Sequence, residues 1–266
     1  MRGTARECEY YNQPMTLDST QRFSSRVDNY VKYRPSYPSE VIDLLRERCG
    51  LGPGAAVADL GAGTGILSAL LLDAGAQVFA VEPNRGMRGA AEKLLAGRSG
   101  FVSVAGTAEA STLEAHSVEL VVAGQAFHWF DPGRARREAL RILAAGGWAA
   151  LIWNERPEEP TPFLTDYEAL LRRHAPEYER VQSLRAQQQG IGEFFGGAPQ
   201  QAVFANRQIL DLEGLQGRLM SSSYAPEPGE PQHAALIAGL RQVFERHQQG
   251  GSVVFPYRTL VFFGQP

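Results

Sequence analysis

Cysteine is scarce in this sequence. Its 266 residues include only Cys8 and Cys49, which lie far apart and outside any CxxC or Cys/His spacing. This usage indicates neither a disulfide framework nor a zinc site, and we expect no bound metal. Two isolated cysteines fit a reducing compartment, so we expect the protein in the cytoplasm.

Excess positive charge and long apolar runs are also lacking. The formal net charge is -3, which provides no overall field to attract nucleic acid or an anionic membrane. The longest apolar run, around Ala69–Leu72, is far too short to span a bilayer, and the N-terminus shows no apolar targeting region. We therefore expect a small-molecule partner, no nucleic acid and no membrane.

The sequence does contain a regular alternation of two patterns. Short runs rich in valine and alanine are separated by segments of helical spacing such as ILSALLLDAG and PGRARREALRILAAGG. Strands that alternate with helices predict βαβ units and a doubly wound parallel sheet. Beyond Trp153 the composition shifts to proline, charge and long polar side chains, which predicts a helical insertion. The predicted strands are AAVADL, AQVFAVE, GFVSVA, VELVVAG, GGWAALIWN, QAVFANRQILDL and SVVFPYRTLVFFG.

The stretch Val57–Leu67, VADLGAGTGIL, packs three glycines into five residues between a strand and a helix. Such a loop is expected to place bare backbone N–H groups and a helix N-terminus beside a ligand, although an ordinary glycine-rich turn is the alternative. The dinucleotide fingerprint GxGxxG requires a small residue where this chain has Ile66. Asp59 would repel a pyrophosphate but suit a cation.

The run DLGAGTG, followed by a second strand ending in Val81-Glu82-Pro83-Asn84, resembles motifs I and II of the class I S-adenosylmethionine-dependent methyltransferases. The resemblance implies S-adenosyl-L-methionine as cofactor, with Glu82 accepting both ribose hydroxyls. Met87 is similar to the residue beside the adenine, unless it is helix core, and Thr107 opens the loop that reads the adenine edge, unless it is a plain N-cap. The cofactor-binding residues that the resemblance implies are Asp59, Gly61, Ala62, Gly63, Gly65, Glu82, Pro83, Met87, Thr107, Ala108, Glu109 and Gln125.

The segment Gln125–Asp131, QAFHWFD, stands where this family brings residues against the methionine part of the cofactor and the acceptor. His128 is the candidate catalytic residue because its unperturbed pKa suits a general base, with a structural histidine as the alternative. The upstream run YRPSYP is similar to a small-molecule branch, methyltransferase type 11, that includes trans-aconitate-type and ubiquinone-type enzymes. The predicted substrate-binding residues are Tyr33, Arg34, Phe127, Trp129 and Trp153. For Phe127 a position in the core is the alternative.

The resemblance covers the whole chain and implies a Rossmann-like, doubly wound, seven-stranded, mostly parallel sheet whose last strand is antiparallel. We expect residues 1–38 to form an N-terminal arm over the active site and residues 39–154 the S-adenosylmethionine-binding core. Residues 155–202 would be a helical cap and residues 203–266 would complete the sheet. The assembly is expected to be a monomer or homodimer.

The predicted activity is methyl transfer to a small organic acceptor, which can be a carboxylate, a hydroxyl, an amine or an activated carbon. The fourth strand does not end in the Asn-Pro-Pro-Tyr type of motif that resembles enzymes acting on nucleic acid or protein amides. Two separated cysteines cannot supply the thiolates that arsenic methylation in this fold needs. Two alternatives stay open: a nicotinamide-dependent oxidoreductase, and a non-catalytic module that binds S-adenosylmethionine.

Overall fold

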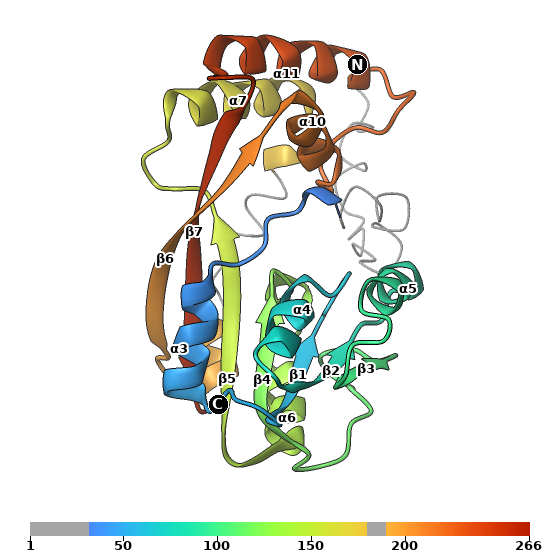
Figure 1. The fold of residues 1–266 in the computed structure, drawn as a ribbon, viewed down its shortest axis with the longest axis vertical. Coiled ribbons are helices and arrows are strands. Elements are labelled where there is room, and N and C mark those ends of the chain that lie inside the picture. The colour runs from blue at the N-terminus through green and yellow to red at the C-terminus, as the bar shows by residue number, and fades with distance from the viewer. Residues whose placement is uncertain (1–31, 180–189) are drawn as a thin grey trace, which may run out of the picture.

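The computed structural model describes residues 32–179 and 190–266 (Figure 1). Residues 1–31 of the predicted arm and residues 180–189 of the predicted cap lie outside the described residues. The strands are β1 (Ala56–Leu60), β2 (Gln77–Val81), β3 (Phe101–Val104), β4 (Val118–Gly124), β5 (Leu143–Glu155), β6 (Gln200–Leu210) and β7 (Val253–Gly264). The helices are α3 (Ser39–Cys49), α4 (Ile66–Asp73), α5 (Arg85–Leu94), η1 (Phe127–Trp129), α6 (Pro132–Ile142), α7 (Pro162–His174), α9 (Ile191–Phe195), α10 (Leu212–Met220) and α11 (His233–His247).

One sheet organises the described chain, with the strand order β3-β2-β1-β4-β5-β7-β6. The strands β3, β2, β1, β4 and β5 pair in parallel, and β7 lies antiparallel between β5 and β6. The predicted fold class is therefore confirmed, including the antiparallel last strand. The chain reverses its direction of winding between β1 and β4, and sheets of this kind bind ligands beyond the carboxyl ends of the strands at such a point.

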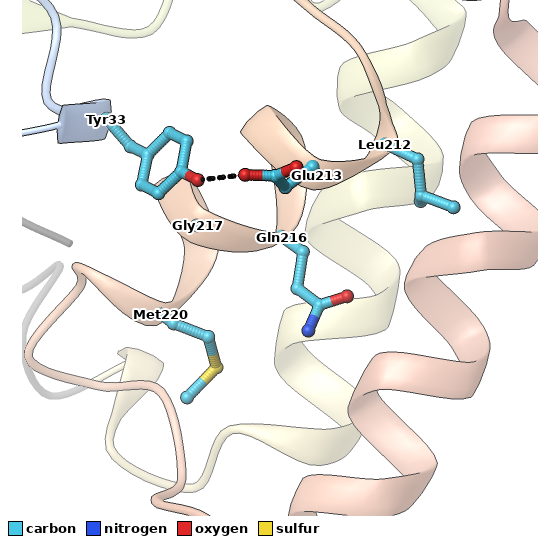
Figure 2. A pocket seen from close by; sticks show the side chains of 6 residues that line it. All are labelled: Tyr33, Leu212, Glu213, Gln216, Gly217 and Met220. Atoms are coloured by element: carbon cyan, nitrogen blue, oxygen red, sulfur yellow. Dashed lines mark hydrogen bonds between the residues drawn. The ribbon is translucent and has the colours of Figure 1, made fainter.

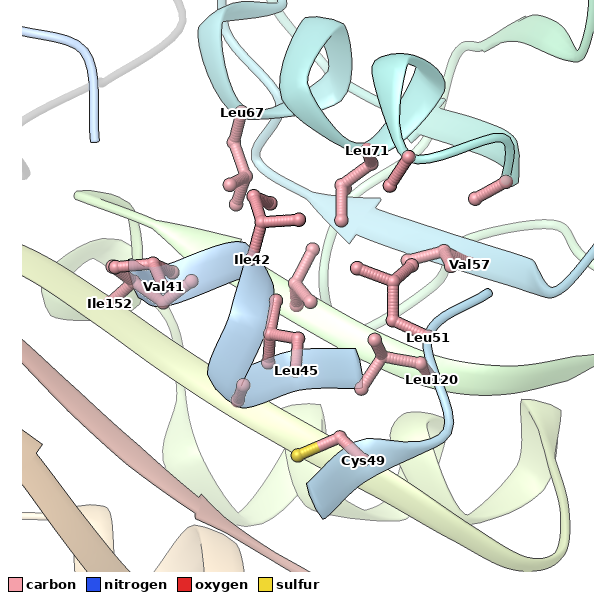
Figure 3. Close-up of a cluster of buried hydrophobic side chains, with 14 of the residues drawn as sticks. Val41, Ile42, Leu45, Cys49, Leu51, Val57, Leu67, Leu71, Leu120 and Ile152 are labelled. Atoms are coloured by element: carbon pink, nitrogen blue, oxygen red, sulfur yellow. The ribbon is translucent and has the colours of Figure 1, made fainter. Parts of the chain in front are cut away.

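Both faces of the central strands are buried, which explains why these strands read as unbroken apolar runs in the sequence. Val57 of β1 and Leu120 of β4 point to the face covered by α3 and α4, whereas their neighbours Ala58 and Val121 point to the face covered by α6. Figure 3 shows the first of these clusters, in which Leu45 of α3 is fully buried. Burying a side chain of that size stabilises the fold by about 1.5–3 kcal/mol.

A second apolar cluster lies at the far end of the long strands, where α7, α10 and α11 pack over β6 and β7 (Figure 1). Tyr167 of α7, Leu215 of α10 and Phe255 of β7 are all fully buried there. The helical layer thus includes α10 and α11, which lie beyond the cap expected for 155–202, and β6 begins inside that range at Gln200. The helix α7, which precedes β6 in the sequence, shares one apolar core with α10 and α11, which follow it. The order of the elements along the sequence does not reveal this contact.

Candidate functional site

The glycine loop joins β1 to α4, and two of its glycines are required by packing within the protein. A Cβ on Gly61 would lie 2.7 Å from the Cβ of Ala126, and one on Gly65 would lie 2.8 Å from a leucine methyl group. Both also have positive φ angles, 69° and 86°, which glycine adopts without strain. A Cβ on Gly63 would meet a single methyl carbon at 3.5 Å. Gly63 is therefore the glycine whose open side a ligand can approach.

The backbone donors of this loop are occupied by the end of β2. The N–H groups of Gly61 and Ala62 donate to the carbonyl oxygen of Val81 at 2.9 and 3.1 Å, and that of Gly63 donates to Oε2 of Glu82 at 2.9 Å. The expectation of bare N–H groups beside a ligand is wrong for these three residues. The reason is topological, because β1 and β2 are neighbours and their carboxyl ends meet at the same edge.

Glu82 is held by the backbone on both of its carboxylate oxygens. Besides the bond from Gly63, Oε1 accepts from the N–H of Asn84 at 2.8 Å, and the residue is only 8% exposed. Burial raises the pKa of Glu82, while these backbone bonds and nearby Arg88 favour its charged form. A carboxylate has about four lone-pair positions, so Glu82 retains acceptor capacity in a fixed orientation.

Asp59 ends β1 as a fully buried carboxylate that is only half satisfied. Its Oδ2 accepts from Oγ of Ser68 at 2.6 Å. In the described part of the chain, Oδ1 of Asp59 and Oγ1 of nearby Thr64 have no hydrogen-bond partner. Burial raises the pKa of Asp59 to about 7, and the charge of Glu82 adds to the increase. Buried polar atoms without partners are uncommon in folded proteins, so a partner for this oxygen is expected.

Met87 and Asn84 lie beside the loop at the start of α5. Oδ1 of Asn84 accepts from the N–H of Met87 at 3.0 Å and caps the helix, directly after Pro83. The Met87 side chain is buried, and its Cε is the atom that faces Gly63. This placement suits the predicted contact with adenine and equally the alternative, a residue of the helix core.

The loop after β3 is a tight turn rather than a helix start. Thr107 and Ala110 exchange two backbone hydrogen bonds of 3.1 and 3.2 Å, and Ala108 between them is buried. Oε1 of Glu109 accepts from the N–H of Asp131 at 2.9 Å. Glu109 therefore ties this turn to the start of α6, and the Thr107 side chain receives only a 3.3 Å bond from the Glu109 N–H.

The carboxyl end of β4 carries backbone strain. Gln125 has a φ of 57°, and its side-chain Nε2 donates to the carbonyl of Asn154 at 2.9 Å. A non-glycine residue held in this region costs on the order of 1–3 kcal/mol, and such residues gather at functional sites. The residue before it, Gly124, has no room for a side chain, because the Tyr37 hydroxyl lies 2.5 Å from the position that its Cβ would occupy.

The aromatic run after β4 divides into one core residue, Phe127, and three partly exposed ones, His128, Trp129 and Phe130. Phe127 is buried and packs edge-to-face on Trp153 and Phe194, with ring centroids 6.1 and 5.3 Å apart. Phe127 thus occupies the core, the alternative that its sequence left open. His128 and Trp129 are half-buried, with ring centroids 4.9 Å apart. These two rings and the partly buried Trp153 stay our predicted lining of the acceptor pocket.

The described part of the arm contacts α10. The ring of Tyr33 lies where a side chain on Gly217 would be, and its hydroxyl donates to Glu213 at 2.8 Å. Nη2 of Arg34 donates to the carbonyl of Ser221 at 2.7 Å. An open pocket of about 360 Å³ lies along this contact, and Figure 2 shows the side chains that line it. Its lining residues are Tyr33, Leu212, Glu213, Gln216, Gly217 and Met220.

Sequence reasoning missed two arginines beside the second apolar cluster, of which Arg156 is partly buried and Arg218 is buried. Arg156 follows β5 directly and pairs with Glu168 at 2.9 Å. Arg218 of α10 is 7% exposed and donates through Nε to the Tyr257 hydroxyl at 3.0 Å. The available signal was the position of Arg218 three residues after Leu215, on the apolar face of a helix where a charged residue is unexpected.

The predicted cofactor residues are brought to one edge of the sheet. The glycine loop, Glu82 and Gln125 follow the neighbouring strands β1, β2 and β4. Within residues 32–179 and 190–266, no three histidine, cysteine or acidic side chains gather in a way that could hold a metal ion. In the same residues no helix has both the length and the apolar character needed to span a bilayer.

Comparison with known proteins agrees with this geometry. Residues 58–151 match the family described as a methyltransferase domain. The chain is 43% identical over 143 residues to an uncharacterized methyltransferase of Mycobacterium tuberculosis, a match of 53% of this chain and 55% of the relative. It is 27% identical over 247 residues to a methyltransferase-like protein of Schizosaccharomyces pombe, covering 90% of this chain and 93% of the relative. The stronger match therefore spans about half the length of the mycobacterial relative.

A solved structure shows the same fold. The structure of a protein assigned as a type II methyltransferase, from Anaeromyxobacter dehalogenans, superposes on this chain with a TM-score of 0.63 at 22% identity. The superposition covers 88% of this chain and 98% of the other. The segment that matches the methyltransferase domain family runs from Ala58 in β1 to Leu151 in β5. It therefore contains the glycine loop, Glu82 and the aromatic run. Residues 58–151 therefore form a methyltransferase domain, and the motifs and fold of the chain are similar to those of the class I S-adenosylmethionine-dependent methyltransferases.

Proposed function

We propose that this protein transfers a methyl group from S-adenosylmethionine to a small organic acceptor. The observation that carries the proposal is the half-satisfied carboxylate of Asp59 at the end of β1, beside the oriented carboxylate of Glu82. Two carboxylates in neighbouring positions repel a phosphate-bearing ligand and favour one that offers a cation and hydroxyl groups. The cofactor of this family has both.

The residues present fit that cofactor. Asp59 supplies a buried carboxyl oxygen without a partner in the described chain, and it would ionise to hold a cationic group of the cofactor. Glu82 would accept the ribose hydroxyls through its remaining lone pairs, and Gly63 leaves its side of the loop open. When bound, S-adenosylmethionine supplies the methyl group and loses the charge of its sulfonium. Met87, the turn at Thr107–Ala110 and Gln125 are proposed to complete the binding site.

The acceptor would approach the carboxyl end of β4, where His128 and Trp129 lie. An aromatic wall excludes water and restricts the approach of the acceptor, and both effects favour an in-line displacement. Transfer to a carboxylate breaks the S–CH₃ bond, forms an O–CH₃ bond and moves no proton. Transfer to a hydroxyl also releases a proton, which His128 would accept. We favour the first case, in which His128 is part of the pocket wall.

Calorimetry tests the cofactor assignment directly. The protein should bind S-adenosylmethionine and its demethylated product, and NADH should not compete. Asp59→Asn and Glu82→Gln keep the size of each side chain and should each weaken binding. An exposed control, Asp43→Asn on α3, should not. Tight NADH binding without affinity for S-adenosylmethionine would instead indicate an oxidoreductase.

Catalysis needs a second measurement. Release of labelled methyl into a panel of carboxylates, phenols, amines and activated carbons would establish an enzyme. Cofactor binding with no transfer to any member of the panel would favour a non-catalytic module. The small-molecule branch, the cytoplasmic location, the monomer or homodimer state and the absence of nucleic acid and membrane partners also stay predictions.

A further inference from the structure

We propose that Arg218 binds an anionic group of the methyl acceptor, so that the acceptor is a small organic acid. The inference rests on the proposed function, because it names the chemical class of molecule that this methyltransferase would take. It is carried by a buried guanidinium that lacks a countercharge, by the tyrosine hydroxyls around it, and by the route of the chain between it and the glycine loop.

Arg218 is 7% exposed, yet its hydrogen bonds are all to neutral groups. Nε donates to the Tyr257 hydroxyl at 3.0 Å and Nη1 to Oγ of Ser222 at 3.1 Å. Its guanidinium carbon also lies 5.6 and 5.8 Å from the centroids of the Phe255 and Tyr257 rings. Within the described residues no carboxylate lies at ion-pair distance, and Nη2 donates to no group. A buried charge is normally paired, so the site favours an anion.

Nearby Arg156 shows how a satisfied arginine looks in the same environment. It forms an ion pair with Glu168 at 2.9 Å, and Nη1 also donates to the Tyr178 hydroxyl. The charge of Arg156 is therefore compensated by protein groups, whereas that of Arg218 is not. Close by, the Tyr167 hydroxyl is buried and has no hydrogen-bond partner in the described chain. A hydroxyl without a partner and a guanidinium without a countercharge are donors suited to one carboxylate.

The chain itself limits the distance from Arg218 to the predicted cofactor site. Tyr33 packs on Gly217, the residue before Arg218, and Tyr37 packs beside Gly124 at the end of β4. Between them, the carbonyl of Ser36 accepts hydrogen bonds from two asparagine side chains of β5 and β6. Four residues span at most about 14 Å between the Cα atoms of Tyr33 and Tyr37, and the two side chains add to this distance at either end. This segment runs between the sheet and α10 in Figure 1.

That spacing gives Arg218 a role in positioning rather than in chemistry. With one anionic group held at Arg218, the rest of an extended acid would be directed toward the end of β4, where a second nucleophilic atom would accept the methyl group. A planar guanidinium binds a carboxylate through two parallel hydrogen bonds, which orients the bound molecule as well as attracting it. An acceptor without a negative charge would leave Arg218 uncompensated and would bind poorly.

The test compares the wild-type protein with Arg218→Met, Arg218→Lys and a control, Arg241→Met, which alters an exposed arginine of α11. The probes are succinate and citrate, each paired with its neutral amide. Thermal unfolding and labelled methyl transfer are measured with each probe. Calorimetry with the demethylated cofactor is run on every variant, so failure of the proposed function is detected separately from failure of this inference.

We expect at least one carboxylate, but not its amide, to raise the wild-type unfolding temperature and to accept methyl groups. Arg218→Met should bind the cofactor normally and raise the acceptor KM at least tenfold with a smaller change in kcat. Arg218→Lys should be intermediate, and Arg241→Met should match the wild type. The inference is overturned if no carboxylate binds the wild type, if amides serve equally well, or if a folded Arg218→Met variant keeps its acceptor KM within twofold.

Discussion

Replacing Asp59 with asparagine should change how the stability of the cofactor-free protein depends on pH. The carboxyl is fully buried, and burial raises its pKa to about 7, whereas an aspartate in an unfolded chain titrates near 3.9. Below about pH 4 both states hold the proton, and Asp59 contributes no pH dependence. Between about pH 4 and pH 7 only the unfolded state ionises, which favours unfolding as the pH rises. Above pH 7 both states are ionised and the penalty is constant.

The size of the effect follows from the two pKa values. They differ by about 3 units, and each unit corresponds to about 1.4 kcal/mol, so the whole effect approaches about 4 kcal/mol. About 3 kcal/mol of it should be lost between pH 5 and pH 8. Asparagine keeps the size and an acceptor for the Ser68 hydroxyl but does not titrate. The asparagine variant should therefore lack this component of the pH dependence.

Denaturant unfolding at pH 5, 6, 7 and 8, without cofactor, measures the difference. The free energy of unfolding of the wild type, minus that of Asp59→Asn, should fall between pH 5 and pH 7 and level off towards pH 8, because the other titrating groups are common to both proteins and cancel. The exposed control Asp43→Asn should give a nearly constant difference. A wild-type minus Asp59→Asn difference that varies by less than about 0.5 kcal/mol would refute the reasoning. It would show that Asp59 is already ionised in the folded protein at pH 5.

Three further predictions concern the predicted site. Glu82→Ala should weaken binding of S-adenosylmethionine at least tenfold in calorimetry, because a hydrogen bond to a charged group contributes about 1.5–3 kcal/mol. A change below twofold would show that Glu82 only stabilises the glycine loop and does not bind the cofactor. Gly63→Val should abolish cofactor binding while circular dichroism shows a folded domain, because the branched side chain would fill the open side of the loop. His128→Ala should raise the acceptor KM and leave the pH profile of turnover unchanged. A pH-dependent turnover that disappears in this variant would instead identify His128 as a general base.

The sequence by itself determined the order of the strands and helices and the location of the cofactor motifs. Buried parallel strands such as β1 and β4 need apolar residues on both faces, so each produced a mostly apolar run that ended in a loop. The motif ending in Glu82 could be recognised because a carboxylate at that position has a chemical purpose that few other residues can serve. These features depend only on residues that are close together in the sequence, so they can be predicted from the sequence alone.

The tertiary structure alone decided which neighbours these residues meet. Gly61 is a glycine because Ala126, 65 residues later in the chain, occupies the space of its side chain, a fact that no loop pattern contains. Phe127 became core through rings of β5 and α9. Arg218 stands out only once α7 and β7 close around it, since an arginine on a helix is unremarkable until its surroundings exclude water. Burial and the absence of a countercharge depend on contacts between distant segments, so they exist only in the folded chain.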